Sequence, residues 1–413
     1  MSQTAASKPP LFVVYLSQEW AEYHRRPHWQ AMAQLAPVLA VEPPAALLTS
    51  LIRPERMQAR FRDKGIPRKT DDGVWLMRPV SLGSFGVAIR APMIGWLDSI
   101  LMGGQIKRAI REIPAEFSGV VNVLVMPHHA AMARQIGEEV TVYEVIDEYR
   151  VFPDQSAFDP NDRRARLAIR AESELLNDVD LVIASSQALC DSRRQHHANV
   201  HYLPNAADFA FFNRACDVDL SLPDDIAKLP SPRLGYVGGV NELIDLPLLE
   251  QLAVRHPEWS MVLIGQVRGT HTYQQSDALK RLRNLPNVYL LGHRPYESLP
   301  AYLKALDVCL MPFVLNPWMQ ASSPNKTFQY LAAGKPVVST NFPEARRVES
   351  VVYVAENPDR FIALCEQALT EKSPELINAR IEVARENSTE RRAEKYLSIV
   401  QELLTQKAAS GHG

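Results

Sequence analysis

The chain has 413 residues, of which 46% are hydrophobic and 22% are charged, and its formal net charge is −2. This is the composition of a globular protein, and it lacks the excess of basic residues that a nucleic-acid binder needs to neutralise a phosphate backbone. A chain of this length exceeds one ordinary core and suits two domains of similar size.

The cysteines are widely spaced, without a CxxC pair that would indicate a zinc site or redox chemistry. We therefore expect a reduced, cytoplasmic protein. They are Cys190, Cys216, Cys309 and Cys365.

Strand-like apolar runs alternate with helical stretches through the first half of the chain. The first run, 11–16, follows two prolines without a basic leader, so it predicts a buried strand rather than a signal peptide. Strands separated by helices predict a parallel sheet with helices on both faces. The later strand-like runs cover 120–126, 140–149, 181–186 and 199–208, and residues 163–176 predict a charged helix.

The segment 87–104 is apolar, but it carries Arg90 and Asp98 and is interrupted by Pro92. These residues make it a poor membrane span. Two interpretations remain open. We favour a helix packed against its own domain, and the alternative is a helix that contacts a membrane surface.

A proline-punctuated polar stretch, 224–233, predicts a linker, after which the alternation of strands and helices restarts. A last helix, 388–404, follows the strands of the second half and is expected to cross back to the first domain. The sequence thus predicts an α/β protein with domains at 1–223 and 224–386, and the crossing helix and tail at 387–413. The strand-like runs of the second half are 233–240, 259–266, 287–294, 307–313, 337–340 and 351–356.

One stretch, "SSPNKTFQYLAAGKPVVST", has the signals of a short helix between two strands. Ser322 or Ser323 suits the N-cap, Pro324 suits the first helical position, and Gly334 offers a left-handed stop. Lys326 then lies in the first turn, where the helix dipole disfavours a cation. A bound anion would reverse that preference, since helix starts beside parallel strands often bind phosphates.

Several motifs between residues 233 and 404 resemble those of a known family. "YVGG", "NVYLLGHRPYESLPAYLKALDVCLMPF" and "SPNKTFQYLAAGKPVVST" resemble the GT-B glycosyltransferases of bacterial surface-polysaccharide assembly, in the large retaining group. "VYEVIDEY", "LVIASSQAL" and "HYLPNAAD" in the first half resemble the same proteins more loosely.

The resemblance implies two Rossmann-like doubly wound domains that face each other across a cleft. The second domain would bind a nucleoside diphosphate sugar, with UDP-sugars favoured, and the first a saccharide or lipid-linked saccharide acceptor. A hexose-type unit would be transferred with retention, without a cofactor or a required metal ion. Such a protein would be cytoplasmic, with the inner face of the membrane as its place of action if the acceptor is lipid-linked.

The predicted donor site follows from the resemblance and from the helix-start argument together. Without a DxD-type acidic metal site, cations and backbone donors must stabilise the leaving diphosphate. His293 and Arg294 follow a strand where relatives hold the base. The alternative for Lys326 is an ordinary surface lysine. The predicted nucleotide-sugar-binding residues are Gly238, Gly239, Arg268, His293, Arg294, Ser323, Asn325, Lys326 and Gln329, with no metal ligand.

The sequence departs from the family pattern at one place. Many retaining relatives carry two glutamates at the positions that read Ala321 and Gln329 here. Gln329 can still hydrogen-bond a ribose hydroxyl, although less strongly than a carboxylate. Ala321 cannot, so either 316–323 supplies a sugar contact or activity is reduced.

The catalytic candidates follow two strands of the first half. His128 and His129 occupy the place where similar enzymes present a histidine to the donor sugar, and ordinary loop histidines are the alternative. Asp147 and Glu148 end a strand, where an acid could orient an acceptor hydroxyl or take its proton. A helix cap or a salt-bridged loop acid is their alternative.

The acceptor candidates follow the first strand. Arg25 and Arg26 could clamp a phosphate of a lipid-pyrophosphate acceptor, with Trp29 against an apolar or sugar surface. A solvated basic turn is the alternative. Two rival functions also remain, a non-catalytic nucleotide-sugar-binding subunit and a sugar-nucleotide epimerase of the same fold.

Overall fold

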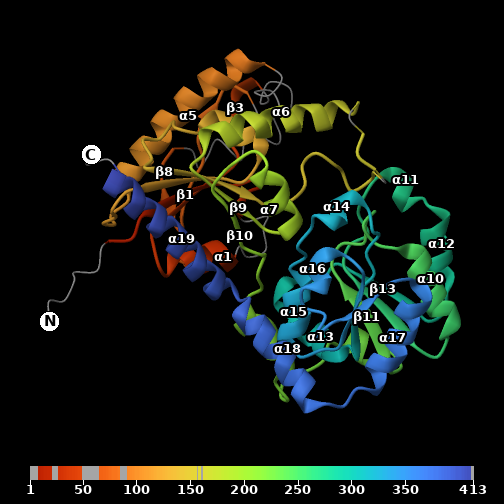
Figure 1. Cartoon of the computed structure of the whole chain (residues 1–413). Helices are drawn as coiled ribbons and strands as arrows, with labels where there is room; N and C mark the ends of the chain where they lie inside the picture. The colour runs from red at the N-terminus through yellow and green to blue at the C-terminus, as the bar shows by residue number, and fades with distance from the viewer. Residues whose placement is uncertain are drawn as a thin grey trace, which may run out of the picture. The chain divides into compact units, whose positions relative to one another are not determined.

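The computed structural model describes residues 8–20, 27–48, 65–83, 91–155, 157–159 and 161–410. The chain divides into two compact units, each with its own sheet (Figure 1). The first unit comprises Met1–Arg150, Asp159–Pro204 and Arg392–Gly413, and the second comprises Val151–Phe158 and Asn205–Arg391.

The main sheet of the first unit has the strand order β10-β9-β8-β7-β1-β2-β5-β4. All neighbouring strands are parallel except β4 and β5. The order reverses direction between β1 and β7, and such a switch point is where doubly wound sheets bind ligands. The strands are β1 (Leu11–Tyr15), β2 (Val38–Val41), β4 (Arg68–Lys69), β5 (Trp75–Met77), β7 (Val120–Leu124), β8 (Val140–Val145), β9 (Leu181–Ala184) and β10 (Val200–Tyr202), and a separate pair is β3 (Ala45–Ala46) and β6 (Val80–Ser81).

Helices pack on this sheet. They include the C-terminal helix α19 from Arg392 onward. Tyr396 of that helix is buried and contacts the rings of Phe12 and Trp29. Arg392 forms a buried ion pair of 2.6 Å with Glu144 of β8. The helices are α1 (Pro27–Ala33), α5 (Pro92–Glu112), η2 (Pro127–Met132), α6 (Arg163–Asp178), α7 (Gln187–Arg194) and α19 (Thr389–Ser410), of which the last begins in the second unit.

The sheet of the second unit has the order β13-β12-β11-β14-β15-β16, and all its strands are parallel. This is the dinucleotide-binding order of a Rossmann sheet, with its switch point between β11 and β14. The strands are β11 (Arg233–Val237), β12 (Ser260–Ile264), β13 (Val288–Gly292), β14 (Val308–Met311), β15 (Val337–Thr340) and β16 (Tyr353–Ala355).

Helices cover the second sheet as they do the first (Figure 1). Buried apolar side chains from these helices and from the strands form one core. The helices are α8 (Phe209–Asn213), η3 (Arg214–Cys216), α9 (Asp224–Ala227), α10 (Leu246–Arg255), α11 (His271–Gln274), α12 (Asp277–Asn284), η4 (Tyr296–Ser298), α13 (Leu299–Ala305), α14 (Pro317–Gln320), α15 (Lys326–Ala332), α16 (Pro343–Arg346), α17 (Pro358–Thr370) and α18 (Pro374–Glu386).

The boundary between the units differs from the predicted one. The first unit's main part ends at Pro204 rather than at residue 223. Phe211, Phe212 and Ile226 are buried in the core of the second unit, which explains why this stretch belongs there. The predicted linker 224–233 is therefore part of the second unit. Its residues 224–227 form α9, and residue 233 begins β11.

No helix in the described parts of the chain is both long and apolar enough to cross a membrane. Residues 92–104 of the predicted apolar segment 87–104 lie in α5, and residues 87–90 lie outside the described residues. Met102, Ile106 and Ala109 of α5 are buried in the first unit. This agrees with the favoured interpretation for one face of the helix.

Candidate functional site

The switch point of the second sheet brings together two of the predicted motifs. Gly238 and Gly239 directly follow β11, and the segment that leads into α15 follows β14. The phenolic oxygen of Tyr330 on α15 accepts a hydrogen bond of 2.8 Å from the backbone N–H of Val237. This bond holds α15 against the end of β11, so Lys326 at the start of α15 is placed beside the glycine turn.

Gly238 has a φ of 149°, which L side chains rarely adopt. A Cβ atom there would lie 2.2 Å from Cε of Lys326 and 2.8 Å from its Nζ. Gly265, after β12, has a φ of 150°, and a Cβ on it would lie 1.9 Å from the carbonyl oxygen of Gly238. The close approach of these backbones and of the lysine therefore requires glycine at both positions.

The side chain of Lys326 is partly buried, and its Nζ lies 5.4 Å from the ring centroid of Tyr236. Burial lowers the pKa of Lys326 to about 8. Among the residues that the structure describes, no carboxylate lies within ion-pair distance of this amine. A partly desolvated cation beside a glycine turn is a favourable partner for a phosphate.

The start of α15 corrects the predicted helix. The helix begins at Lys326, and not after a serine cap with Pro324 in its first turn. Ser322 donates to the carbonyl of Trp318, and Ser323 accepts from the backbone N–H of Asn205 at 3.4 Å, so both serines have other partners. With only seven residues, α15 has a small dipole, and the site rests on Lys326 and the glycine turn.

Three other predicted donor residues lie near this point. A Cβ on Gly239 would lie 3.8 Å from Cδ of the exposed Arg268, so the arginine stem passes beside the turn. Asn325 is exposed directly before Lys326, and Gln329 is partly exposed one turn further along α15. The structure thus groups these residues with the lysine.

The two residues predicted to hold the base differ from each other. His293 is exposed in the segment after β13. Arg294 forms an ion pair of 2.6 Å with Asp225 and donates to the hydroxyl of Tyr302 at 2.8 Å. The hydrogen bond from Arg294 to Asp225 is the main reason that the pKa of Arg294 is raised. Arg294 therefore ties α9 to α13, and a role in holding the base is not supported by its contacts.

The predicted histidine pair lies in η2, after β7 and at the switch point of the first sheet. Burial lowers the pKa of His128 to about 4 and holds that of His129 well below the usual value for histidine, so both imidazoles are neutral at pH 7. His129 is fully buried, with its ring centroid 5.5 Å from that of Tyr15. This position corrects the prediction for His129, which is a core residue.

His128, in contrast, lines a pocket of about 460 Å³ between α5, η2 and α6. Gly95, Trp96 and Ser99 of α5 and Arg170 and Glu174 of α6 are also part of the wall. Of the two histidines, His128 is the one with access to a ligand-sized space.

Asp147 and Glu148 follow β8, and their environments separate them. Burial raises the pKa of Asp147 to about 7. Burial alone would also raise the pKa of Glu148, but hydrogen bonds from Arg150 and Arg193 outweigh it and lower the pKa to about 2. Asp147 therefore has the proton affinity of a general base or acid, whereas Glu148 stays ionised as the partner of two arginines.

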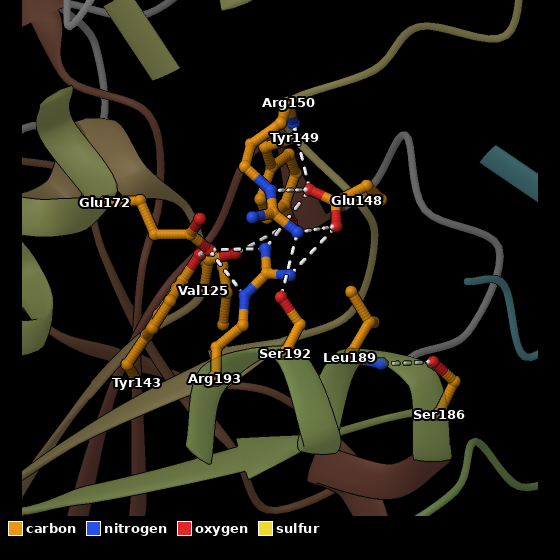
Figure 2. Close-up of polar contacts among 10 residues, drawn as sticks. All are labelled: Val125, Tyr143, Glu148, Tyr149, Arg150, Glu172, Ser186, Leu189, Ser192 and Arg193. Carbon is orange, nitrogen blue, oxygen red and sulfur yellow. Dashed lines mark hydrogen bonds and ion pairs between the residues drawn. The ribbon is translucent and has the colours of Figure 1, made fainter. Parts of the chain in front are cut away.

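The partners of Glu148 form a buried network (Figure 2). The guanidinium of Arg193, which is 1% exposed, donates to Glu148 at 2.9 Å and to Glu172 of α6 at 2.7 Å. Arg150 donates to Glu148 at 2.6 Å and to the hydroxyl of Ser192 at 2.9 Å. The prediction of a catalytic Glu148 is thus replaced by the salt-bridged alternative.

The same network holds the segment that carries Asp147. Tyr149 donates from its hydroxyl to the carbonyl oxygen of Val125 at 3.0 Å, which connects this segment to the end of β7 (Figure 2). Asp147 lies between the end of β8 at Val145 and the anchored residues Glu148 and Tyr149, so its backbone is held on both sides.

Of the three predicted acceptor-binding residues, the structure describes only Trp29. Arg25 and Arg26 lie outside the described residues. Trp29 is 2% exposed and packs against Phe12 and Tyr396 in the core of the first unit. Trp29 is therefore a core residue and does not present its ring to an acceptor.

Several residues that shape the two regions were not found from the sequence. A glycine that directly follows a strand was a readable signal for Gly265, whereas Tyr236 and Tyr330 looked like ordinary core aromatics. Arg193 carried no signal, since its two carboxylate partners are distant in sequence.

Residues 231–371 match the model of the family described as "Glycosyl transferases group 1". The matched segment contains the glycine turn and Lys326. A search of curated proteins finds the Bacillus subtilis (strain 168) protein named "Putative teichuronic acid biosynthesis glycosyltransferase TuaH", 28% identical over 225 residues. The alignment covers 51% of this chain and 54% of that protein, so the chain spans about half the length of this relative.

Solved structures resemble nearly the whole chain. Sucrose-phosphate synthase (tll1590) from Thermosynechococcus elongatus has a TM-score of 0.65 and 16% identity, covering 97% of this chain and 100% of that one. Anabaena Alr3699/HepE in complex with UDP has a TM-score of 0.62 and 12% identity, covering 95% and 100%. Together with the mainly parallel first sheet and the fully parallel second sheet, this confirms the predicted α/β fold with two Rossmann-like domains, shared with GT-B glycosyltransferases.

Proposed function

We propose that this protein is a glycosyltransferase that moves a sugar from a nucleoside diphosphate sugar to a saccharide or lipid-linked saccharide in surface-polysaccharide biosynthesis. The family match over 231–371 and the similarity to TuaH support the transfer activity. The name of TuaH, in which teichuronic acid biosynthesis appears, supports a polysaccharide acceptor.

The observation that carries the proposal is the position of Lys326 across Gly238 at the switch point of the second sheet. In this arrangement the lysine amine and the glycine turn would contact the diphosphate of the donor, with Arg268 on the outer side. As the sugar–phosphate bond breaks, negative charge develops on the diphosphate, and a positioned cation stabilises that charge. Gln329 would hydrogen-bond the ribose from the same helix.

We infer that the donor is a UDP-sugar. The support comes from structural relatives, since Anabaena HepE was solved in complex with UDP. Transfer would proceed with retention and without a metal ion, because Lys326 and backbone N–H groups would replace a metal at the diphosphate. Exposed His293 would lie beside the base.

The first unit would supply the acceptor side of the reaction. Asp147, with its pKa raised to about 7, would orient the acceptor hydroxyl or take its proton. His128 would act as a neutral hydrogen-bonding group toward the transferred sugar, because burial keeps its pKa near 4. Arg25 and Arg26 would contact an acceptor phosphate.

The experiment that tests the proposal is a turnover assay with a panel of UDP-sugars, with EDTA and with or without saccharide acceptors. We expect UDP release that requires an acceptor and persists in EDTA, with a product whose anomeric configuration matches that of the donor. Asp147→Asn is expected to lower the rate about 10²- to 10⁴-fold. Asp191→Asn, which changes an exposed carboxylate of the same unit, is the control.

The rival functions predict different results in that assay. The departures at Ala321 and Gln329 favour a non-catalytic nucleotide-sugar-binding subunit, which would bind UDP without releasing it from any donor. An epimerase would change the donor sugar in the absence of an acceptor. Either result would contradict the proposed transfer.

A further inference from the structure

One face of α5 is exposed and changes in character along the helix. Its first half exposes five large apolar side chains, at position 93 and in the pairs 96–97 and 100–101, a spacing that keeps them on one face of the helix. The last third of the same face exposes Lys107, Arg108 and Arg111. The apolar side chains and their exposed fractions are Met93 at 74%, Trp96 at 61%, Leu97 at 40%, Ile100 at 50% and Leu101 at 41%.

The orientation of this face is determined by contacts on the other side of the helix. Asp98 accepts a hydrogen bond of 2.9 Å from the backbone N–H of Gly83. Gln105 exchanges two hydrogen bonds with the backbone of Val80, at 2.9 and 2.8 Å. Since Met102 and Ile106 are buried below them, the apolar residues cannot turn inward without breaking these contacts. Figure 1 shows α5 along the outer side of the first unit.

A cluster of water-exposed apolar side chains indicates an interaction surface for a protein, a membrane or a ligand. The three cations at the other end of the face indicate what it binds. In the described parts of the chain, no carboxylate lies within ion-pair distance of Lys107, Arg108 or Arg111. A helix with tryptophan and aliphatic residues beside unpaired cations matches the interface of an anionic bilayer, where apolar groups enter the acyl boundary and cations contact headgroup phosphates.

We propose that the outer face of α5 docks the protein on an anionic lipid bilayer. Trp96, Ile100 and their apolar neighbours would enter the interface, and Lys107, Arg108 and Arg111 would contact acidic headgroups. The pocket that contains His128 is also lined by Gly95, Trp96 and Ser99 of α5. Docking would therefore place that pocket at the lipid surface, where a lipid-linked compound is available.

The test is flotation of the full chain with vesicles of phosphatidylcholine, with and without phosphatidylglycerol. We expect binding to the vesicles that contain phosphatidylglycerol and a loss of that binding at high salt. Lys107→Glu with Arg108→Glu is expected to weaken binding at least about 25-fold, because each cation near an anionic surface contributes about fivefold. Trp96→Ser with Ile100→Ser is expected to weaken it at least about tenfold.

Matched controls come from exposed residues of the second unit. Val218→Ser with Val254→Ser removes two apolar side chains that are 87% and 61% exposed. Arg283→Glu with Arg360→Glu reverses two exposed charges. Both double variants should bind vesicles as the unchanged protein does, and thermal unfolding should show that every variant is folded.

A second readout follows the depth of Trp96 directly. Brominated lipids should quench part of the tryptophan fluorescence on vesicle binding, and Trp96→Phe should lose that quenching while still floating. Three results would each overturn the proposal. They are no flotation with either vesicle, equal flotation of the α5 variants, or a loss of self-association in those variants without lipid, which would identify a second copy as the occupant. No sugar donor is needed, so the result is independent of the proposed transfer.

Discussion

The side chain of Lys326 crosses Gly238 so closely that a Cβ atom on the glycine would lie 2.2 Å from the lysine Cε. The two segments are far apart in the sequence, with β12, β13 and β14 between them. They meet because β11 and β14 are neighbours in the sheet. The hydrogen bond from Val237 to Tyr330 holds the contact. The predicted donor site depends on this relationship.

Gly238→Ala should disturb both the fold and the site. The substitution places a Cβ on a backbone with φ of 149° and against Lys326, so the lysine must move. We expect a loss of about 1–3 kcal/mol in the free energy of unfolding and a clear loss of UDP affinity. Gly104→Ala, in the first unit and outside the predicted donor site, is the control, since no atom lies within 4 Å of its new Cβ. Equal effects of the two substitutions in urea unfolding and UDP titration would contradict this geometry.

UDP affinity should fall as the pH rises above about 8. The folded-state pKa of Lys326 is lowered to about 8 by burial, below the usual value, so the amine is charged below that pH and loses its charge above it. The affinity should decline by up to about tenfold per pH unit, and binding at high pH should take up a proton. Calorimetry in buffers of different ionisation enthalpy measures that uptake. Lys326→Met should bind weakly and without this dependence, and a flat profile for the unchanged protein would count against the assignment.

The same lowered pKa has a consequence for stability. The unfolded chain holds the lysine proton more tightly than the folded chain does, so between about pH 8 and the ordinary lysine pKa the unfolded state binds more protons. This single group should therefore increase the free energy of unfolding as the pH rises through that window.

Arg193→Met should strongly destabilise the first unit. The substitution leaves the carboxylates of Glu148 and Glu172 buried without their main partner. We expect a loss of about 3–5 kcal/mol in the free energy of unfolding. Arg194→Met removes the next arginine, which is 51% exposed and pairs with Asp191, and should change stability by about 0.5 kcal/mol or less. Similar unfolding midpoints for the two variants would show that the buried network contributes little.

The histidine pair should separate into one functional and one structural member. His128→Ala should lower the transfer rate, because the side chain lines the pocket between α5, η2 and α6 of the first unit. It should leave UDP affinity unchanged, because we assign UDP binding to the second unit. His129→Ala should lower the free energy of unfolding by about 2–5 kcal/mol, because it leaves a cavity in the core. Transfer rates and melting temperatures measure both. Unaltered transfer by His128→Ala would move the catalytic assignment elsewhere.

The fold could be predicted because its signals are local. The apolar run at 120–126 and the strand before Gly238 each determine a buried strand regardless of the rest of the chain. The short strands between residues 45 and 81 were not predicted, since two or three residues carry too little periodicity. The boundary was misplaced because Phe211 and Phe212 look the same whichever core they join.

The site was predicted less completely, because its residues depend on partners distant in sequence. The proximity of Lys326 and Gly238 could be expected from strand order in a doubly wound sheet. In contrast, the partners of Arg294 and Glu148 appear only after folding, since Asp225 and Arg193 lie far along the chain from them. Trp29 shows the same limit, because a tryptophan after a strand suits a ligand surface or a core equally well.

The central claim is that the second unit binds a nucleoside diphosphate through Lys326. We would titrate UDP, GDP, ADP and TDP calorimetrically into the protein and into Lys326→Met, each with and without EDTA, with exposed Lys372→Met as the control. The account predicts UDP binding that persists in EDTA, that Lys372→Met retains, and that Lys326→Met weakens about 10- to 100-fold, as expected for a charge-assisted hydrogen bond. Failure to bind any of the nucleotides, or an unchanged UDP affinity in folded Lys326→Met, would contradict it.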